Sequence, residues 1–68
     1  MIVLNGEPLA GCDGATVADL VVRAGLDPVA ARGVAVAVDA EVIPRGEWPT
    51  RTVAAGANVE VLTAMQGG

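Results

Sequence analysis

The chain has 68 residues, a formal net charge of −4 and 53% hydrophobic residues, which suits one small folded domain better than a disordered chain. Its four basic residues are scattered arginines and Trp48 is its only aromatic residue, so neither a nucleic-acid partner nor an anionic membrane surface is expected. A single cysteine excludes an internal disulfide, and the absence of histidine excludes the usual Cys/His zinc sites and histidine-based catalytic triads.

The first residues predict a β-hairpin. The apolar residues 1–4 are typical of a buried strand, and Asn5-Gly6 is a strong hairpin signal because both residues tolerate a positive φ. Residues 7–12 are predicted to return as a second strand. Pro8 lacks the N–H group that a central strand needs, so we expect this second strand at an edge of the sheet.

A short amphipathic helix is predicted next. Thr16 and Asp19 have a spacing that resembles a capping box, in which the threonine hydroxyl accepts from an otherwise unpaired N–H group. One apolar stripe at helical spacing then follows, made of Val17, Leu20, Val21 and Ala24. Gly25 stands where a left-handed C-cap is expected. A helix of about nine residues is not stable alone, so it must pack on a sheet.

Two strands joined by a turn are predicted after the helix. Valine alternates with alanine over residues 34–38, which indicates a strand with a large face and a small face. Asp39-Ala40 predicts a short turn, and residues 41–43 predict a shorter strand that stops at Pro44.

The remaining residues predict one more long strand. Residues 45–51 are predicted to be irregular, residues 52–53 to form a brief extended piece, and residues 59–63 to form the last strand. Because the first and last strands are the most continuously apolar, we expect them to be central neighbours paired in parallel. The order β-β-α-β-β-β predicts a single α+β domain over residues 1–68, a roll with the helix on one face of a mixed sheet.

The end of the chain holds the candidate reactive group. The last four residues, predicted to form a flexible tail, are Met65-Gln66-Gly67-Gly68. A terminal carboxylate is ionised at neutral pH and is a poor electrophile, but adenylation would turn it into a mixed anhydride that a sulfur nucleophile can convert to a thiocarboxylate. Glycines without Cβ atoms let the backbone enter a narrow channel. Four extended residues span about 13–14 Å, which is enough to reach a partner's active site.

Several segments are similar to those of one known family. They are residues 2–7, residues 16–20, residues 36–39, residues 42–48 with their Pro44-Arg45-x-x-Trp48 pattern, and the final Gly67-Gly68. Through them the whole chain resembles the thiamine-biosynthesis sulfur carrier family (ThiS). The resemblance implies the β-grasp (ubiquitin-like) fold, with a mixed sheet of about four or five strands and one main helix.

The resemblance also implies a route for sulfur. Gly68 would be adenylated by a ubiquitin-activating-type enzyme of the ThiF class, which uses ATP and magnesium, and a persulfide protein would deliver the sulfur. The Gly68 thiocarboxylate would then donate sulfur to thiazole synthase, the ThiG class. The chain itself would bind no cofactor or metal and would be a protein co-substrate, not an enzyme. Met65-Gln66 depart from the small apolar residues that many relatives carry there.

Other residues are candidates for partner contacts. We expect Leu62 on the sheet face that the helix leaves uncovered, where it would contact the adenylating enzyme together with Met65 and Gln66 of the tail. Trp48 is expected to plug the sheet edge or to contact a partner. Arg45 is expected to pair with a carboxylate, to stack on Trp48 or to dock a partner.

Three other functions compete with the sulfur carrier. The small subunit of molybdopterin synthase (MoaD) shares the fold, the tail and the chemistry but lacks the Pro-Arg-x-x-Trp pattern. A modifier that forms isopeptide bonds through Gly68 and an interaction domain with an inert tail are the others. No apolar run approaches the ~20 residues that span a bilayer, and the N-terminus lacks the basic start of a signal peptide. We therefore expect a cytoplasmic protein that is monomeric when free.

Overall fold

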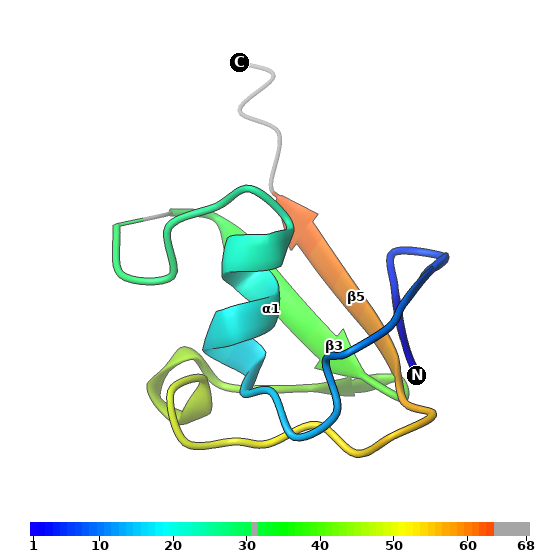
Figure 1. Ribbon diagram of the computed structural model, residues 1–68. Coiled ribbons are helices and arrows are strands. Elements are labelled where there is room, and N and C mark those ends of the chain that lie inside the picture. Colours follow the sequence, from blue (N-terminus) through cyan, green and yellow to red (C-terminus); the bar gives the residue numbers. More distant parts are fainter. Residues whose placement is uncertain (31, 64–68) are drawn as a thin grey trace.

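The described chain forms one mixed sheet with a helix on one of its faces (Figure 1). The computed structural model describes residues 1–30 and 32–63. Its elements are β1 (Ile2–Leu4), β2 (Glu7–Leu9), α1 (Val17–Arg23), β3 (Val34–Val38), β4 (Glu41–Val42), the 3-10 helix η1 (Arg45–Glu47) and β5 (Asn58–Thr63). The strand order in the five-stranded sheet is β2-β1-β5-β3-β4.

The pairing of the strands follows the order predicted from their apolar content. β1 and β5 are neighbours and run parallel, with Leu4 opposite Val59, whereas every other pair is antiparallel. β2, which contains Pro8, lies at one edge of the sheet. The predicted central pair, the edge position of Pro8 and the predicted α+β β-grasp fold are therefore confirmed.

Both hairpin turns use left-handed backbone. Asn5 and Gly6 have φ values of 51° and 83°, as their sequence signal predicted. Asp39 and Ala40 have φ values of 49° and 71°, which is strained for alanine because its Cβ crowds the following carbonyl. The Asp39 carboxylate accepts a hydrogen bond from the N–H of Asn58 at 2.9 Å, which helps to hold this turn.

The helix has the caps that its sequence predicted. The Thr16 hydroxyl accepts from the N–H of Asp19 at 3.1 Å, and the Asp19 carboxylate accepts from the N–H of Thr16 at 3.1 Å. Gly25 follows the C-cap with a φ of 88°. α1 has seven residues, and its two cap residues, Thr16 and Ala24, account for the difference from the predicted length of about nine. Its stripe faces the core that also contains Val36 and Val59 of the sheet.

Two predictions of local structure were wrong. β2 ends at Leu9 and does not continue to Cys12, and Gly11, with a φ of 76°, turns the chain away from the sheet. Residues 45–51 are not wholly irregular, because the N–H of Glu47 donates to the carbonyl of Pro44 and the N–H of Trp48 donates to that of Arg45. Such single turns carry no apolar periodicity, so the pattern of the sequence did not reveal η1.

Neither the helix nor the 3-10 turn in residues 1–30 and 32–63 has the length and apolar character that crossing a membrane requires.

Candidate functional site

β5 connects the centre of the sheet to the predicted reactive end of the chain. Figure 1 shows β5 running in the same direction as α1, so that both end at the same side of the molecule. Met65, Gln66, Gly67 and Gly68 lie outside the described residues, and their roles stay predictions. The described part of the site is therefore the base from which they continue.

That base is firmly attached on both sides. Val59 and Val61 are buried against the helix-covered core, and β3 pairs with β5 along its length. On the other side, the N–H of Asn5 donates to the carbonyl of Val59 at 2.9 Å, and the Asn5 side-chain oxygen accepts from the N–H of Val61 at 2.8 Å. The strand that precedes the tail is thus held to Asn5 by one main-chain and one side-chain hydrogen bond, the second across a sequence separation of 56 residues.

Leu62 lies on the uncovered face of the sheet, as its alternation with the buried Val61 predicted. Its side chain is 58% exposed, and Ala35 of β3 lies directly opposite it. Val42 of β4 is 69% exposed and lies opposite Ala37 of β3. On its other side, Ala37 lies opposite Glu60 of β5. We call these five side chains the open face; they form an apolar surface that contains one carboxylate.

Sequence reasoning missed the place of Val42. Its position beside the residues opposite Leu62 depends on the register between β3 and β4, in which Ala37 pairs with Val42. The alternation of valine and alanine in β3 indicated which face each residue takes, but the register needed the geometry of the turn at Asp39 and Ala40.

Arg45 joins η1 to the loop that follows α1. Its guanidinium carbon lies 5.0 Å from the centroid of the Trp48 ring, so the predicted stacking is confirmed. The guanidinium also donates to the carbonyls of Pro28 and Val29 at 3.2 and 3.3 Å. Arg45 therefore holds the loop through main-chain oxygens.

Trp48 belongs to the core. Its side chain is 2% exposed, and its indole N–H donates to the carbonyl of Ile43 at 3.0 Å. A partner contact was predicted as the alternative role of Trp48 and stays untested. Since so little of the Trp48 ring is exposed, its main contribution outside the core is to hold the Arg45 guanidinium, which stacks on the ring.

Asp27 organises the same loop and was not singled out from the sequence. Its carboxylate accepts from the N–H groups of Val29 and Ala30 at 2.8 and 3.1 Å. These two hydrogen bonds, assisted by the charge of Arg45, hold the pKa of Asp27 below its usual range. An aspartate that bonds the N–H two residues later is a known turn signal, so the sequence did contain a clue.

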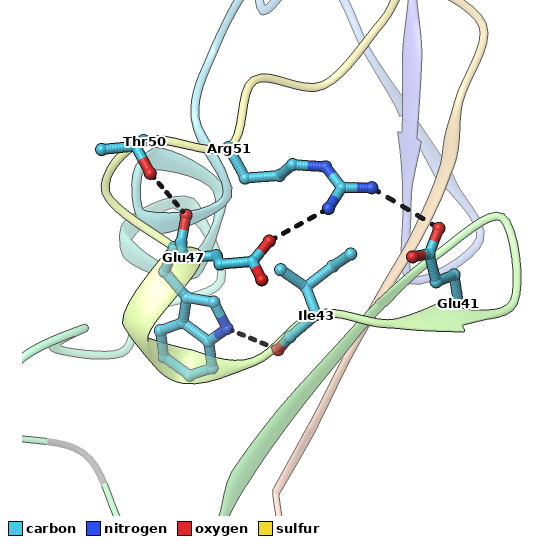
Figure 2. Close-up of polar contacts among 6 residues, drawn as sticks. Glu41, Ile43, Glu47, Thr50 and Arg51 are labelled. Carbon is cyan, nitrogen blue, oxygen red and sulfur yellow. Dashed lines mark hydrogen bonds and ion pairs between the residues drawn. The ribbon is translucent and has the colours of Figure 1, made fainter.

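Arg51 ties two carboxylates together on the helix side of the molecule. Figure 2 shows its guanidinium between Glu47, at 3.2 Å, and Glu41, at 3.4 Å. The Thr50 hydroxyl also donates to the Glu47 carbonyl at 3.4 Å (Figure 2). This network fastens η1 to β4.

The structure does not bring all predicted contact residues together. The Trp48 carbonyl accepts from the N–H of Ala18 at 3.0 Å, which places Trp48 and Arg45 beside the first turn of α1. Leu62 points from the opposite face of the sheet. One compact partner surface therefore cannot be built from Leu62, Arg45 and Trp48 together.

The comparisons with known proteins agree with the geometry. A sequence profile of the ThiS family matches residues 2–68. The chain belongs to the ThiS family. The crystal structure of the thiamine biosynthesis protein ThiS from Geobacter metallireducens is similar to this ThiS chain, with a TM-score of 0.73 and 29% identity over 98% of this chain and 97% of that one. The predicted family is thereby confirmed.

A second solved structure supports the same likeness. The solution structure of a thiamine biosynthesis protein from Geobacter metallireducens has a TM-score of 0.73 and 30% identity, over 98% of this ThiS chain and 86% of that chain. A comparison with curated proteins found no significant match.

Proposed function

We propose that this ThiS chain carries sulfur for the thiazole ring of thiamine, as a thiocarboxylate on Gly68. The observation that carries the proposal is the family match over residues 2–68, which includes both the Pro44-Arg45-x-x-Trp48 pattern and Gly67-Gly68. The name of the similar Geobacter metallireducens protein, a thiamine biosynthesis protein, supports the same pathway.

The chemistry takes place at the terminal carboxylate. A ThiF-class enzyme joins the Gly68 carboxylate to AMP from ATP and releases pyrophosphate, with magnesium and ATP bound by the enzyme. A persulfide sulfur attacks the acyl carbonyl and AMP leaves. A thiol of the sulfur-delivering protein then cleaves the S–S bond and is oxidised to a disulfide, which leaves the thiocarboxylate for transfer by thiazole synthase of the ThiG class.

The domain contributes position and recognition. Buried Val59 and Val61 fix the strand that leads to the tail, while Leu62 and Val42 expose apolar surface beside it. Exposed apolar patches of this kind bind other proteins, so we assign the open face to the adenylating enzyme. The glycines give the backbone room to enter the active site of that enzyme. In this role the chain is a protein co-substrate, not an enzyme.

Intact mass spectrometry tests the proposal. The chain is incubated with a ThiF-class enzyme, ATP, magnesium and a persulfide donor. We expect a mass gain equal to the exchange of one oxygen for sulfur. A matched chain without Gly67 and Gly68 should show no gain. An unchanged wild-type mass, or the same gain in the shortened chain, would contradict the proposal.

A second measurement separates thiamine from related pathways. Purified thiocarboxylate is given either to thiazole synthase or to the large subunit of molybdopterin synthase, each with its own substrates. Thiazole formation is expected only in the first mixture. Pterin dithiolene formation in the second, or lysine-linked conjugates of the chain in cell extract, would move the assignment to one of the rival functions.

A further inference from the structure

The sheet becomes narrower toward the tail. The pairing of β1 with β5 ends at Leu4 and Val59, and the N–H of Ile43 makes its bond to Val36 before the chain turns away at Pro44. β3 and β5 continue as a pair beyond both points, through Ala35–Leu62 to Val34–Thr63. The base of the sheet has five strands, but its tail end is a two-stranded ribbon.

One edge of this ribbon has main-chain groups with no partner strand among residues 1–30 and 32–63. The carbonyl of Val59 and the N–H of Val61 both bond toward Asn5. Because alternate residues of a strand direct their main-chain groups to the same side, the carbonyl of Val61 and the N–H of Thr63 face that side as well. In the described residues no strand pairs with β5 there beyond Val59.

Asn5 explains why the sheet stops where it does. Its side-chain oxygen takes the place that a carbonyl of a longer β1 would occupy beside Val61. The backbone meanwhile turns into the hairpin at Asn5 and Gly6. Within the described residues, the edge that remains covers Val61–Thr63, a length too short to invite sheet-to-sheet aggregation.

We propose that the adenylating enzyme adds an extended segment of its own beside Val61–Thr63 and pairs with the carbonyl of Val61 and the N–H of Thr63. The inference rests on the proposed function, because it describes how the same chain end is held. Residues 64–68 continue directly from Thr63. A partner that draws Gly68 into its active site must follow this backbone. The first main-chain groups of β5 that it meets at the edge of the ribbon are the N–H of Thr63 and the carbonyl of Val61.

Strand addition fits the side chains present. Main-chain pairing supplies affinity without depending on residue type, whereas pockets for alternate side chains supply specificity. Leu62 lies between the two pairing residues and is 58% exposed, so its side chain can fill a pocket of the same partner.

A proline substitution tests the edge directly. Thr63→Pro removes the N–H that faces the edge and puts a ring in the path of an added strand, while the Ala35–Leu62 pairing stays intact. Thr63→Ala is the matched control, since it keeps the N–H. We expect Thr63→Pro to raise the KM for adenylation about tenfold and Thr63→Ala to change it less than about twofold. Equal KM values for the two variants would overturn the inference.

Amide hydrogen exchange gives a readout that does not depend on a substitution. The Thr63 amide should exchange quickly in the free chain and become protected when the adenylating enzyme is bound, whereas the Ala35 and Ala37 amides should be protected in both states. An unprotected Thr63 amide in the saturated complex would contradict strand addition. Protection that grows with the concentration of the free chain would show that a second copy takes the edge, which also contradicts it.

The two proposals fail in different ways. If strand addition is wrong, the wild-type chain still gains the mass of sulfur, and only the contrast between Thr63→Pro and Thr63→Ala is lost. If sulfur carriage on Gly68 is wrong, the mass gain itself is absent, and if only the thiamine pathway is wrong, the thiocarboxylate forms but thiazole synthase does not use it. Amide spectra of the Thr63→Pro variant are the control that checks whether it keeps the fold.

Discussion

The two faces of the sheet are both apolar, but α1 covers only one of them. On the face covered by α1, Val36, Val59 and Val61 are buried in the same core as Leu20. On the open face, Leu62 exposes a side chain at least as large as those of the buried valines. Because consecutive residues of β5 alternate between these faces, a single strand both anchors the domain and exposes apolar surface. Apolar character alone therefore does not show which residues of the sheet are buried and stabilise the fold. The position of α1 decides which face is covered.

The largest effect on stability is expected when the same substitution, leucine to alanine, is made once under the helix and once on the open face. Leu20→Ala removes a side chain with 0% exposure and leaves a cavity, so the free energy of unfolding should fall by about 3 kcal/mol. Leu62→Ala, at 58% exposure, should change it by less than about 0.5 kcal/mol. Urea unfolding of both variants measures the difference. Similar losses would mean that the open face also holds the fold together.

A charge on the open face tests recognition without burial. Leu62→Asp should leave the fold intact and raise the KM for adenylation about tenfold, because an apolar contact with the enzyme is replaced by a desolvated carboxylate. Val22→Asp is the matched control, since Val22 is 57% exposed on α1, away from the open face. Its KM should stay within about twofold of wild type. If both variants bind the enzyme equally well or equally badly, the assignment of the open face fails.

The smallest effect concerns a loop that belongs to neither face. The pKa of Asp27 is lowered in the folded chain by hydrogen bonds from Val29 and Ala30. The stability that Asp27 contributes is therefore complete above its unfolded pKa of about 3.9 and is lost as the pH falls through the lower folded pKa.

Unfolding at a series of pH values measures this contribution. Asp27→Ala should be less stable than wild type at neutral pH, and the two curves should converge in acid. Glu60→Gln, which removes a carboxylate from the open face, is the control for a general change in charge. A constant gap between wild type and Asp27→Ala at all pH values would contradict the role given to the carboxylate.

Local signals in the sequence predicted most of the fold. Asn5-Gly6 and the Thr16–Asp19 box are readable because the residues that cause the turn and the cap stand next to the backbone that they shape. Alternation in β5 also predicted that Leu62 would be exposed. These features needed no knowledge of the rest of the chain.

The contacts that shape the candidate site were less predictable. Arg45 bonds to the carbonyls of Pro28 and Val29, and carbonyl groups carry no residue-type signal. Asn5 bonds to the N–H of Val61, a partner defined only by the parallel pairing of β1 and β5. Such contacts depend on register and on distant backbone, so they appear only when the chain is folded.

The central position of β5 also has a mechanical consequence. A pull on the chain after Thr63 acts first on the pairing of β5 with β3, and from Val59 back it acts on a strand with neighbours on both sides, β1 and β3. The hydrogen bonds to those neighbours run across the direction of the pull and are loaded together, as in shear, and do not open one at a time. We therefore expect the domain to stay folded while an enzyme pulls on this end of the chain and after it releases it.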